Sequence, residues 1–488
     1  MRLPRLLLSS LSCVTLLLAP VIVGAQQTTT RTAAPSPVAP VAPATREDVQ
    51  ALADKVFAQY TSAVPGCVVG VAQTGAILLE KAYGAADLEQ RTALTANSIL
   101  EAGSVAKQFT AAAVTLLALE GKLRFGDEIQ KYFPEIPRYE RPVTVRMLLD
   151  HTSGLRDWGD IVNMAGWRRG TRAVTHAHVL EVIARQRRTN YPPGDRYSYT
   201  NSGYNLLAML VARVSGQTFA EFTRARLFVP LGMTSTSWRD DYRRVVPGRA
   251  TAYAPLGAAS GWATDMPFED AHGNGALLTT VGDLLRWNEA LTKRSVGGVV
   301  GSALVDSLTR TGRLTNGESI TYAAGLVVDR YRGTTQIGHS GATAGYRAYL
   351  ARYPEQRDLS VAVLCNNSGA STAHAHAMVT GLAAGLTDVA PSSTDFPVAG
   401  TMPHADSLMK FVGDYASDEV GVTFQVRIED GRLVLRRAPA DSWVISRINR
   451  DGRFSAGPWQ LWFTAQREGP VMHLGSGRAH DVVFSARR

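Results

Sequence analysis

Several patterns that assign a function to a chain at once are missing here. No Gly-x-Ser-x-Gly occurs, so the exposed nucleophile turn of α/β-hydrolases is not signalled. No His-Glu-x-x-His and no Walker A pattern occurs, so neither a zinc peptidase helix nor a phosphate-binding loop is indicated. No local run of basic residues is dense enough to favour nucleic-acid binding.

Lysine is scarce, because 44 of the 51 basic residues are arginine and 7 are lysine. The net charge of +9 is therefore carried mostly by guanidinium groups, which suits an acidic partner such as peptidoglycan or an anionic surface. With 488 residues, 45% of them hydrophobic, the chain can bury a large core.

Cysteine is also rare, with only three in the chain. Cys13 lies in the N-terminal apolar run, whereas Cys67 and Cys365 lie in strand-like segments. An oxidising compartment allows a disulfide between the last two, but disulfide geometry is demanding. We expect two buried thiols.

The N-terminus is typical of a secretory signal peptide. Arg2 and Arg5 precede an apolar run over residues 6–23, and a small-residue cleavage pattern ends at Ala25. We expect residues 1–25 to be removed, which lowers the net charge from +9 to +7 as two arginines leave. This predicts a periplasmic or secreted protein with no stable membrane span after cleavage; the alternative is a retained membrane anchor.

A serine and a lysine three positions apart stand at the start of an apolar segment. In a helix Ser104 and Lys107 share a face, and a neutral amine there can take the proton of a hydroxyl that attacks a carbonyl. The segment is apolar on nearly every side up to Leu119, and Gly121 is a stop signal, which predicts a buried central helix. A second Ser-x-x-Lys begins at Ser407, so the spacing alone also fits an N-capping serine and a snorkelling lysine.

A turn-rich loop holds the only Tyr-x-Asn among the sixteen tyrosines, Tyr199-Thr-Asn201. A tyrosine hydroxyl beside a lysine can pass a proton to or from a leaving group, and an asparagine amide can hold a substrate carbonyl. The alternatives are an ordinary half-buried aromatic for Tyr199 and a helix N-cap for Asn201.

A third motif, His339-Ser-Gly341, leads into two strand-like segments at residues 349–353 and 359–364. A glycine there lets a ligand lie against the strand backbone, and a histidine on that edge can orient or polarise a bound carboxylate or carbonyl. The alternative is a turn histidine with satisfied hydrogen bonds.

In this order the three motifs resemble the signature of the serine β-lactamase and penicillin-binding-protein superfamily. The chain is most similar to the class C-like branch, which includes D,D-carboxypeptidases, D-aminopeptidases and family VIII-type esterases. The resemblance covers about residues 46–388 and includes the segments Gly121–Leu123, Leu148–Leu155, Pro230–Thr234 and Gly273–Thr280. It implies an α/β fold in which an antiparallel sheet is flanked by helices, plus a helical lobe, with the active site between them. It also implies that the two strands with Cys67 and Cys365 are neighbours.

The resemblance also implies a role for each motif residue. Ser104 would be the acylated nucleophile, and Lys107 its base, alone or with Tyr199. Tyr199 would also protonate the leaving group or activate the deacylating water, and Asn201 would hold the substrate's amide or ester. The reaction would be a two-step acyl transfer through a covalent ester.

By the same resemblance, backbone N–H groups of Ser104 and Ala342 would form the oxyanion hole, and His339 and Gly341 would bind substrate. The chain departs from the β-lactamase pattern at His339, where many β-lactamases have lysine. A lysine stays charged and grips a carboxylate, whereas histidine is mostly neutral at neutral pH. We therefore expect poor hydrolysis of β-lactams and a closer match to the peptidase and esterase members.

Two further features concern histidine and tryptophan. His-Ala-His occurs at residues 176–178 and 374–376, in segments that read as helix, where positions i and i+2 do not face each other. We expect solvated surface there and no metal, and we expect no cofactor. By contrast, Trp158, Trp167 and Trp262 are expected among the substrate walls.

Alternation and turn signals organise the rest of the chain. An N-terminal hairpin is predicted around Thr74-Gly75, and a second around Asp430-Gly431, with Asp451-Gly452 repeating the signal. We predict a signal peptide at 1–25, a disordered Pro/Thr/Ala linker at 26–45, a hydrolase domain at 46–388, a linker at 389–404 and a C-terminal all-β, barrel-like domain at 405–488. A loop of the last domain is expected to gate substrate access.

Two classes of function remain open. The first is an exported serine hydrolase that acts on a D-amino-acid peptide, a cell-wall fragment or a small ester. The second is a non-turning-over protein that binds penicillin or cell-wall peptides. The intact motifs favour the first class, and the sequence does not indicate the oligomeric state.

Overall fold

The structure is a computed structural model that describes residues 44–168, 170–257, 261–295, 301–387, 409–438, 441–447, 453–466 and 469–487. All of these residues belong to one compact unit, Pro40–Arg488. The predicted signal peptide and the linker at 389–404 lie outside the described residues, as does nearly all of the linker at 26–45. The predicted domain boundaries stay predictions.

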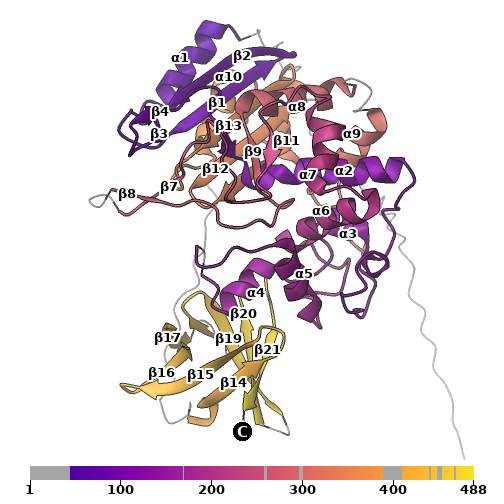
Figure 1. Cartoon of the computed structure of the whole chain (residues 1–488), viewed down its shortest axis with the longest axis vertical. Coiled ribbons are helices and arrows are strands. Elements are labelled where there is room, and N and C mark those ends of the chain that lie inside the picture. Colours follow the sequence, from indigo (N-terminus) through magenta and orange to yellow (C-terminus); the bar gives the residue numbers. More distant parts are fainter. Residues whose placement is uncertain are drawn as a thin grey trace, which may run out of the picture. The chain divides into compact units, whose positions relative to one another are not determined.

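A six-stranded antiparallel sheet in the order β10-β11-β12-β13-β1-β2 forms the centre of the larger part (Figure 1). Its strands are β1 at Cys67–Gln73, β2 at Ala76–Tyr83, β10 at Val327–Tyr331, β11 at Thr334–Thr343, β12 at Tyr346–Tyr353 and β13 at Leu359–Cys365. The β1–β2 hairpin is confirmed, and its turn residues Thr74 and Gly75 both have positive φ, as a two-residue primed turn requires.

Helices cover both faces of this sheet, which explains why β1 is apolar without alternation. Val69 and Val71 belong to the core formed with α1 at Arg46–Val56 and α10 at Ala373–Leu382. Val68 points the other way, into the main core with the central helices.

The disulfide between Cys67 and Cys365 shows that the expectation of two free thiols was wrong. The two residues are directly paired across β1 and β13, with their Cα atoms 4.0 Å apart, although 298 positions separate them in sequence. Strand register, which the local sequence does not reveal, brings them together. The neighbouring positions of the two strands agree with the resemblance.

The predicted central helix is confirmed as α2 at Lys107–Leu119, which is buried from Lys107 to Leu117. A 3₁₀ turn at Gly103–Ala106 precedes it, so Ser104 lies just before the α-helix rather than within it. The other helices of this part are α3 at Val145–Leu149, α4 at Trp158–Met164, α5 at His176–Arg185, α6 at Asn201–Ser215, α7 at Phe219–Thr223, α8 at Val281–Lys293 and α9 at Ser302–Thr309.

Short strands and turns complete this part. The strands are β3 at Ala85–Asp87, β4 at Thr92–Ala93, β5 at Leu100–Glu101, β6 at Ser237–Trp238, β7 at Tyr253–Pro255, β8 at Trp262–Thr264 and β9 at Leu277–Thr279. They form the pairs β3-β4 and β7-β8 and the three-stranded sheet β5-β9-β6. Strand β5 leads directly into the turn that carries Ser104, so this small sheet anchors the start of the motif.

The predicted C-terminal β domain is confirmed as a closed eight-stranded barrel (yellow in Figure 1). Its strands are β14 at Gly413–Ser417, β15 at Val422–Glu429, β16 at Arg432–Arg437, β17 at Asp441–Arg447, β18 at Phe454–Ala456, β19 at Trp459–Gln466, β20 at Gly469–Gly475 and β21 at Val482–Arg487. The hairpin at Asp430-Gly431 joins β15 to β16 as expected, whereas Asp451-Gly452 lies outside the described residues.

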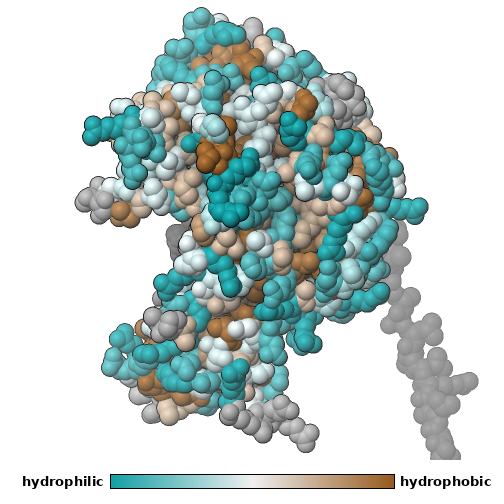
Figure 2. Space-filling view, viewed as in Figure 1, coloured by the Kyte–Doolittle hydropathy of each residue, from teal (hydrophilic) through white to brown (hydrophobic). Residues whose placement is uncertain are grey.

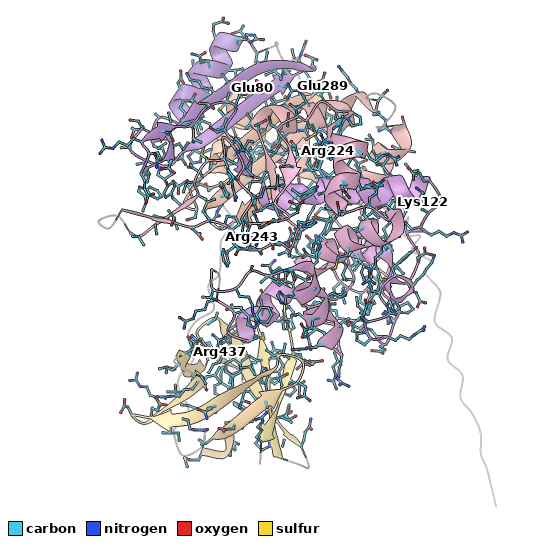
Figure 3. All side chains as sticks on the ribbon, in the orientation of Figure 1. Glu80, Lys122, Arg224, Arg243, Glu289 and Arg437 are labelled. Carbon is cyan, nitrogen blue, oxygen red and sulfur yellow. A yellow bond between two sulfur atoms is a disulfide. The ribbon has the colours of Figure 1, made fainter. Side chains whose placement is uncertain are left out.

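Arg437 joins the barrel to the end of α4. This residue of β16 (labelled in Figure 3) donates through Nη1 to the carbonyl oxygens of Asn163, at 2.5 Å, and Met164, at 2.9 Å. Its guanidinium also pairs with Asp441, so the charge of the buried arginine is compensated.

The surface in view in Figure 2 is mainly hydrophilic, with hydrophobic residues in small scattered groups.

The two His-Ala-His pairs are less exposed than expected, which corrects the prediction of a solvated surface. His176 contacts the backbone oxygen of His272 at 3.0 Å, and His374 stacks on Phe57. His376 stacks on Tyr331.

In the described parts of the chain, no group of three or more His, Cys, Asp or Glu is placed to hold a metal ion. No helix in these parts is long and apolar enough to cross a membrane.

Candidate active site

Ser104 and Lys107 lie together as their spacing predicts. The 3₁₀ turn and the first residue of α2 place Lys107 Nζ 3.1 Å from Ser104 Oγ. Nζ also lies 2.9 Å from Asn201 Oδ1 and 2.6 Å from the backbone oxygen of Asn274. These two oxygens can only accept, so a neutral amine would donate its two N–H groups to them and keep its lone pair for the Ser104 hydroxyl.

Burial determines the charge of Lys107, whose side chain is fully enclosed. Burial holds the pKa of Lys107 well below its usual value; Asp157 raises this pKa, and Arg478 lowers it further. A neutral lysine at neutral pH can accept the proton of Ser104, whereas a charged lysine cannot. The arrangement therefore suits an activated nucleophile.

Tyr199 lies over the same amine, with Nζ 4.8 Å from the centre of its ring. Burial raises the pKa of Tyr199 above its usual value, and a hydrogen bond with Ser104 acts in the opposite direction. Tyr199 therefore carries its proton at neutral pH. It can donate to a leaving group, and the geometry favours Lys107 as the group that first accepts a proton.

Asn201 is the first residue of α6, and the N-cap is Thr200, so the N-cap alternative for Asn201 is wrong. Its backbone N–H donates to Asp157 Oδ2 at 2.7 Å, and its Oδ1 accepts from Lys107. These bonds orient the side chain so that the amide nitrogen is left to donate to a carbonyl oxygen. Both Tyr199 and Asn201 therefore lie beside Lys107, although Asn201 is 94 positions away from it in sequence.

His339 lies on β11 and is almost completely buried, with an exposed fraction of 8%. Nδ1 lies 2.5 Å from the backbone oxygen of Ser340, and Nε2 lies 3.1 Å from the hydroxyl of Tyr322. The carbonyl oxygen can only accept, so Nδ1 carries the hydrogen and Nε2 accepts from Tyr322. Burial, with Lys107 nearby, lowers the pKa of His339 to about 4. His339 is a neutral imidazole at neutral pH.

Two glycines let β11 lie directly against the Ser104 turn. A Cβ at Gly103 would lie 2.6 Å from the nitrogen of Ala342, and a Cβ at Gly341 would lie 2.1 Å from the oxygen of Ala102 and 3.1 Å from the nitrogen of Ser104. Only glycine fits at both positions. This close approach brings the nitrogens of Ser104 and Ala342 to the same side of the site. Their role as an oxyanion hole stays a prediction.

Three further residues support the site, and sequence reasoning did not assign them roles. Asp157 caps α4 and accepts from the backbone of Asn201. Asn274 accepts from Lys107 and lies in the Gly273–Thr280 segment. His151 is fully buried, its ring centre 4.2 Å from that of Tyr199, and it lies in the Leu148–Leu155 segment. The segments that contain Asn274 and His151 resemble segments of the superfamily, and this resemblance was the only sequence signal that pointed to these two residues.

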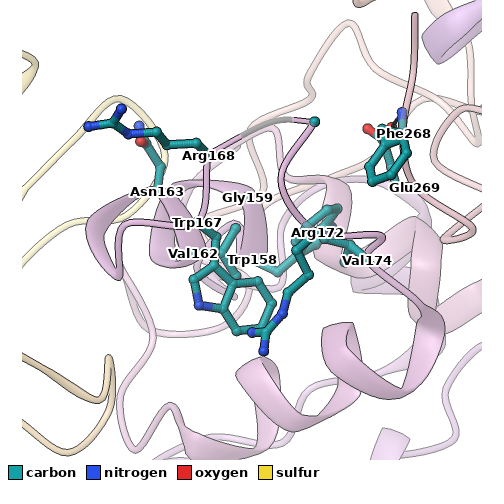
Figure 4. Close-up of a pocket in the computed structure, with 11 residues that line it drawn as sticks. Trp158, Gly159, Val162, Asn163, Trp167, Arg168, Arg172, Val174, Phe268 and Glu269 are labelled. Carbon is teal, nitrogen blue, oxygen red and sulfur yellow. Dashed lines mark hydrogen bonds between the residues drawn. The ribbon is translucent and has the colours of Figure 1, made fainter.

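A cavity of about 540 Å³ lies beside α4 (Figure 4). Trp158 and Trp167, two of the expected substrate walls, line it together with Phe268, and the guanidinium of Arg172 lies 4.3 Å from the ring of Trp167. Trp262 lies on β8 and does not line this cavity, so it does not share a wall with the other two.

The wall of this cavity is linked to the catalytic lysine by hydrogen bonds. Trp158 Nε1 donates to Asn205 Oδ1 at 2.8 Å, and Asn205 Nδ2 donates to Asn274 Oδ1 at 2.8 Å. The backbone oxygen of Asn274 then accepts from Lys107. Asn205 and Asn274 therefore connect Trp158, in the wall of the cavity, to Lys107, although Ser104, Lys107 and Tyr199 do not line the cavity.

The chain is similar in sequence to known proteins. It is similar to penicillin-binding protein 4* of Bacillus subtilis (strain 168), at 28% identity over 75% of this chain and 82% of that protein. It is also similar to a D-aminopeptidase of Cereibacter sphaeroides, at 26% identity over 77% of this chain and 68% of that protein.

Solved structures show the same fold. An octameric penicillin-binding protein homologue from Pyrococcus abyssi superposes with a TM-score of 0.60 at 22% identity, over 90% of this chain and 99% of that chain. D-amino acid amidase from Ochrobactrum anthropi superposes with a TM-score of 0.56 at 21% identity, over 69% and 97%.

A family model also matches most of the chain, in agreement with the fold and the order of the motifs. The model of the Beta-lactamase family matches residues 53–385, which include all the residues that surround Ser104 in this site. The chain therefore belongs to the β-lactamase family of serine hydrolase-fold proteins.

Proposed function

We propose that this protein is an exported serine hydrolase that forms an acyl-enzyme on Ser104 and cleaves an amide or ester. One observation carries the proposal: a fully buried lysine amine, whose pKa burial holds well below its usual value, lies 3.1 Å from the hydroxyl of Ser104. The hydroxyl attacks the carbonyl carbon, its proton passes to Lys107, and Tyr199 supplies a proton to the leaving group. Water then hydrolyses the ester: Tyr199 takes a proton from the water, and Lys107 returns its proton to the Ser104 oxygen.

The substrate class follows from the walls of the site and from the relatives. Asn201 offers an amide donor for a substrate carbonyl, and the cavity beside Trp158 and Trp167 suits an apolar or aromatic side chain. D-aminopeptidases and a D-amino acid amidase are among the relatives. We therefore propose a D-amino-acid peptide, a cell-wall fragment or a small ester as substrate.

Export to the periplasm or the cell exterior belongs to the same proposal. The disulfide between Cys67 and Cys365 supports it, because such bonds persist in oxidising compartments. Expression with the complete N-terminus should give exported protein that starts at Gln26. Protein retained in the cytoplasm with an intact N-terminus would contradict the proposal.

The test of the mechanism is intact mass after incubation with a fluorophosphonate. A single adduct is expected on the wild-type protein and on Ser407→Ala, which removes the other Ser-x-x-Lys, and no adduct on Ser104→Ala. An adduct that persists on folded Ser104→Ala contradicts the assignment. No adduct on any of the three favours the alternative, a protein that binds cell-wall peptides or penicillin without turnover.

A further inference from the structure

The backbone of the connection between β20 and β21 of the barrel is hydrogen-bonded to Asp157 and Asp160, at the start of α4, and to Asn190. The carbonyl oxygen of Arg478 accepts from the N–H of Asp157 at 3.0 Å and from Nδ2 of Asn190 at 3.0 Å. The backbone N–H of Arg478 donates to Asp160 Oδ2 at 2.8 Å, and Ser476 Oγ donates to the same oxygen at 2.6 Å. This connection is therefore held in place independently of the Arg478 side chain.

The side chain of Arg478 forms one long ion pair, with Asp157. Its Nη1 lies 3.4 Å from Asp157 Oδ2, and that oxygen already accepts the shorter bond from Asn201. Nε and Nη2 have no hydrogen-bond partner within the part of the chain that the structure describes. The side chain is 41% exposed, whereas that of Asp157 is 2% exposed. A half-exposed guanidinium with two unused donor positions is suited to bind a planar anion.

Arg478 lies close enough to influence the catalytic groups. The pKa of Lys107 is lowered mainly by burial, and Arg478 lowers it further. The pKa of Tyr199 is raised mainly by burial, and Arg478 lowers it. The contacts continue from Arg478 through Asp157 and Asn201 to Lys107. Two residues, Asp157 and Asn201, therefore connect the guanidinium to the catalytic lysine.

The groups that line the inner part of the site do not supply a positive charge. Lys107 is neutral because it is buried, and His339 is neutral because both ring nitrogens are bonded and its environment is dry. A carboxylate on the substrate would find no cation at either residue. Arg478 offers that charge from the barrel.

We propose that Arg478 binds a carboxylate of the substrate, so that the enzyme prefers a peptide with a free carboxylate beside the scissile bond over the corresponding neutral amide. This inference rests on the proposed function and specifies its substrate class. The carboxylate is the α-carboxylate of the leaving residue or a side-chain carboxylate at that residue, and the probes below separate the two.

The probes are acetyl-D-alanyl-D-alanine, its C-terminal amide, and acetyl-D-alanyl-D-glutamic acid α-amide. The proteins are the wild type, Arg478→Gln, Arg478→Lys and Arg432→Gln, in which an exposed barrel arginine is changed. The readouts are kcat and KM for each probe and, separately, the protection of Ser104 from fluorophosphonate by each probe. Thermal midpoints verify folding, which the backbone bonds of the connection should preserve.

We expect the wild type to favour one carboxylate probe over the amide by at least about tenfold in kcat/KM or in protection, because a charge-assisted bidentate pair is formed. In Arg478→Gln this preference should fall to about twofold, chiefly through the KM of the carboxylate probe; an effect of Arg478 on Lys107 or Tyr199 acts on both probes and cancels in the ratio. Arg478→Lys should retain part of the preference, and Arg432→Gln all of it. Because the guanidinium is half exposed, added salt should reduce the wild-type preference.

Equal handling of the acid and the amide by the wild type would overturn the inference, as would an unchanged preference in folded Arg478→Gln. Labelling of Ser104 without these effects leaves the proposed hydrolase intact and removes only the role of Arg478. If Ser104 is not labelled at all, the proposed function fails. Calorimetric binding of the acid to the wild type, compared with Arg478→Gln, then decides the role of Arg478 alone.

Discussion

The hydroxyl of Tyr322 donates to Nε2 of His339 across 3.1 Å, and this contact makes His339 a neutral acceptor. The other ring nitrogen is bonded to the backbone oxygen of Ser340. The position at which many family members present a charged lysine is therefore occupied here by an uncharged, hydrogen-bonded ring. A substrate carboxylate gains no ion pair from it.

Poor turnover of β-lactams is the first prediction. Because neutral His339 does not grip the β-lactam carboxylate, hydrolysis of a chromogenic cephalosporin should be slow, although acylation can occur. The measurement is steady-state hydrolysis by purified enzyme whose Ser104 is shown to be active by fluorophosphonate labelling. Rapid turnover by that preparation would refute the prediction.

Replacement of Lys107 should strongly slow the acylation of Ser104. Lys107→Met removes the base and keeps the length of the buried side chain, and Lys107→Arg keeps a positive charge that is never lost. Both should lower the rate of Ser104 labelling by about 10²–10⁴-fold, since general base catalysis is worth that much. Lys107→Met should fold at least as well, because a buried amine is removed. Labelling of Lys107→Arg at the wild-type rate would show that charge, not proton transfer, is what Lys107 supplies.

Gly341→Ala should damage the site without unfolding the protein. The added methyl group would lie 2.1 Å from the oxygen of Ala102, so β11 must move away from the Ser104 turn. The labelling rate should fall by about a hundredfold or more, the usual cost of a lost oxyanion donor. Gly126→Ala is the matched control, because no atom lies within 4 Å of its Cβ position. Equal labelling rates for the two variants would contradict the close approach.

Asp150 should make stability depend on pH. Burial raises the pKa of Asp150 from 3.8 to about 7, against the opposing effect of Arg146. Between these values the unfolded chain is ionised and the folded chain is protonated. The contribution of Asp150 to the free energy of unfolding therefore falls as pH rises from about 4 to about 7, by roughly 1.4 kcal/mol per unit.

The matched variant for this effect is Asp150→Asn, which cannot ionise. Its free energy of unfolding relative to the wild type should increase across that pH window and level off above it. Urea denaturation of both proteins at pH 4.5, 6 and 7.5 provides the measurement. The opposite titration of His339 is common to both proteins and cancels in the difference. Parallel stability curves would show that Asp150 is ionised in the folded state.

Loss of the disulfide should destabilise the protein. The bond between Cys67 and Cys365 closes a loop of 298 positions, and the chain-entropy account gives about 6 kcal/mol for so long a loop. The double variant Cys67→Ala/Cys365→Ala should therefore have a lower thermal midpoint, as should the reduced wild type. Thiol titration of the denatured mature protein without reductant should detect no free thiol. Two free thiols would restore the expectation drawn from the sequence.

Much of the fold could be predicted because its signals are local. Thr74-Gly75 and Asp430-Gly431 predicted their hairpins, since two-residue turns demand particular residues. Ser104 and Lys107 meet because they are three positions apart at the start of a helix. Period and spacing also predicted the buried helix α2, although not the 3₁₀ turn that precedes it.

The rest of the site could not be predicted locally. The partners of Lys107 come from 94 and 167 positions away, and Arg478 reaches Asp157 from 321 positions away. No local pattern records which loops meet, and the supporting role of Asp157 became visible only in its contacts.

The sequence by itself determined which reactive groups the chain carries, their order and the helices and hairpins that present them, because these depend on neighbours a few residues apart. Only the tertiary structure decided that Cys67 and Cys365 are bonded, that burial lowers the pKa values of Lys107 and His339, and that a barrel arginine contacts Asp157. Strand register, burial and the docking of distant segments set these properties, and each arises from groups that are brought together only when the chain folds.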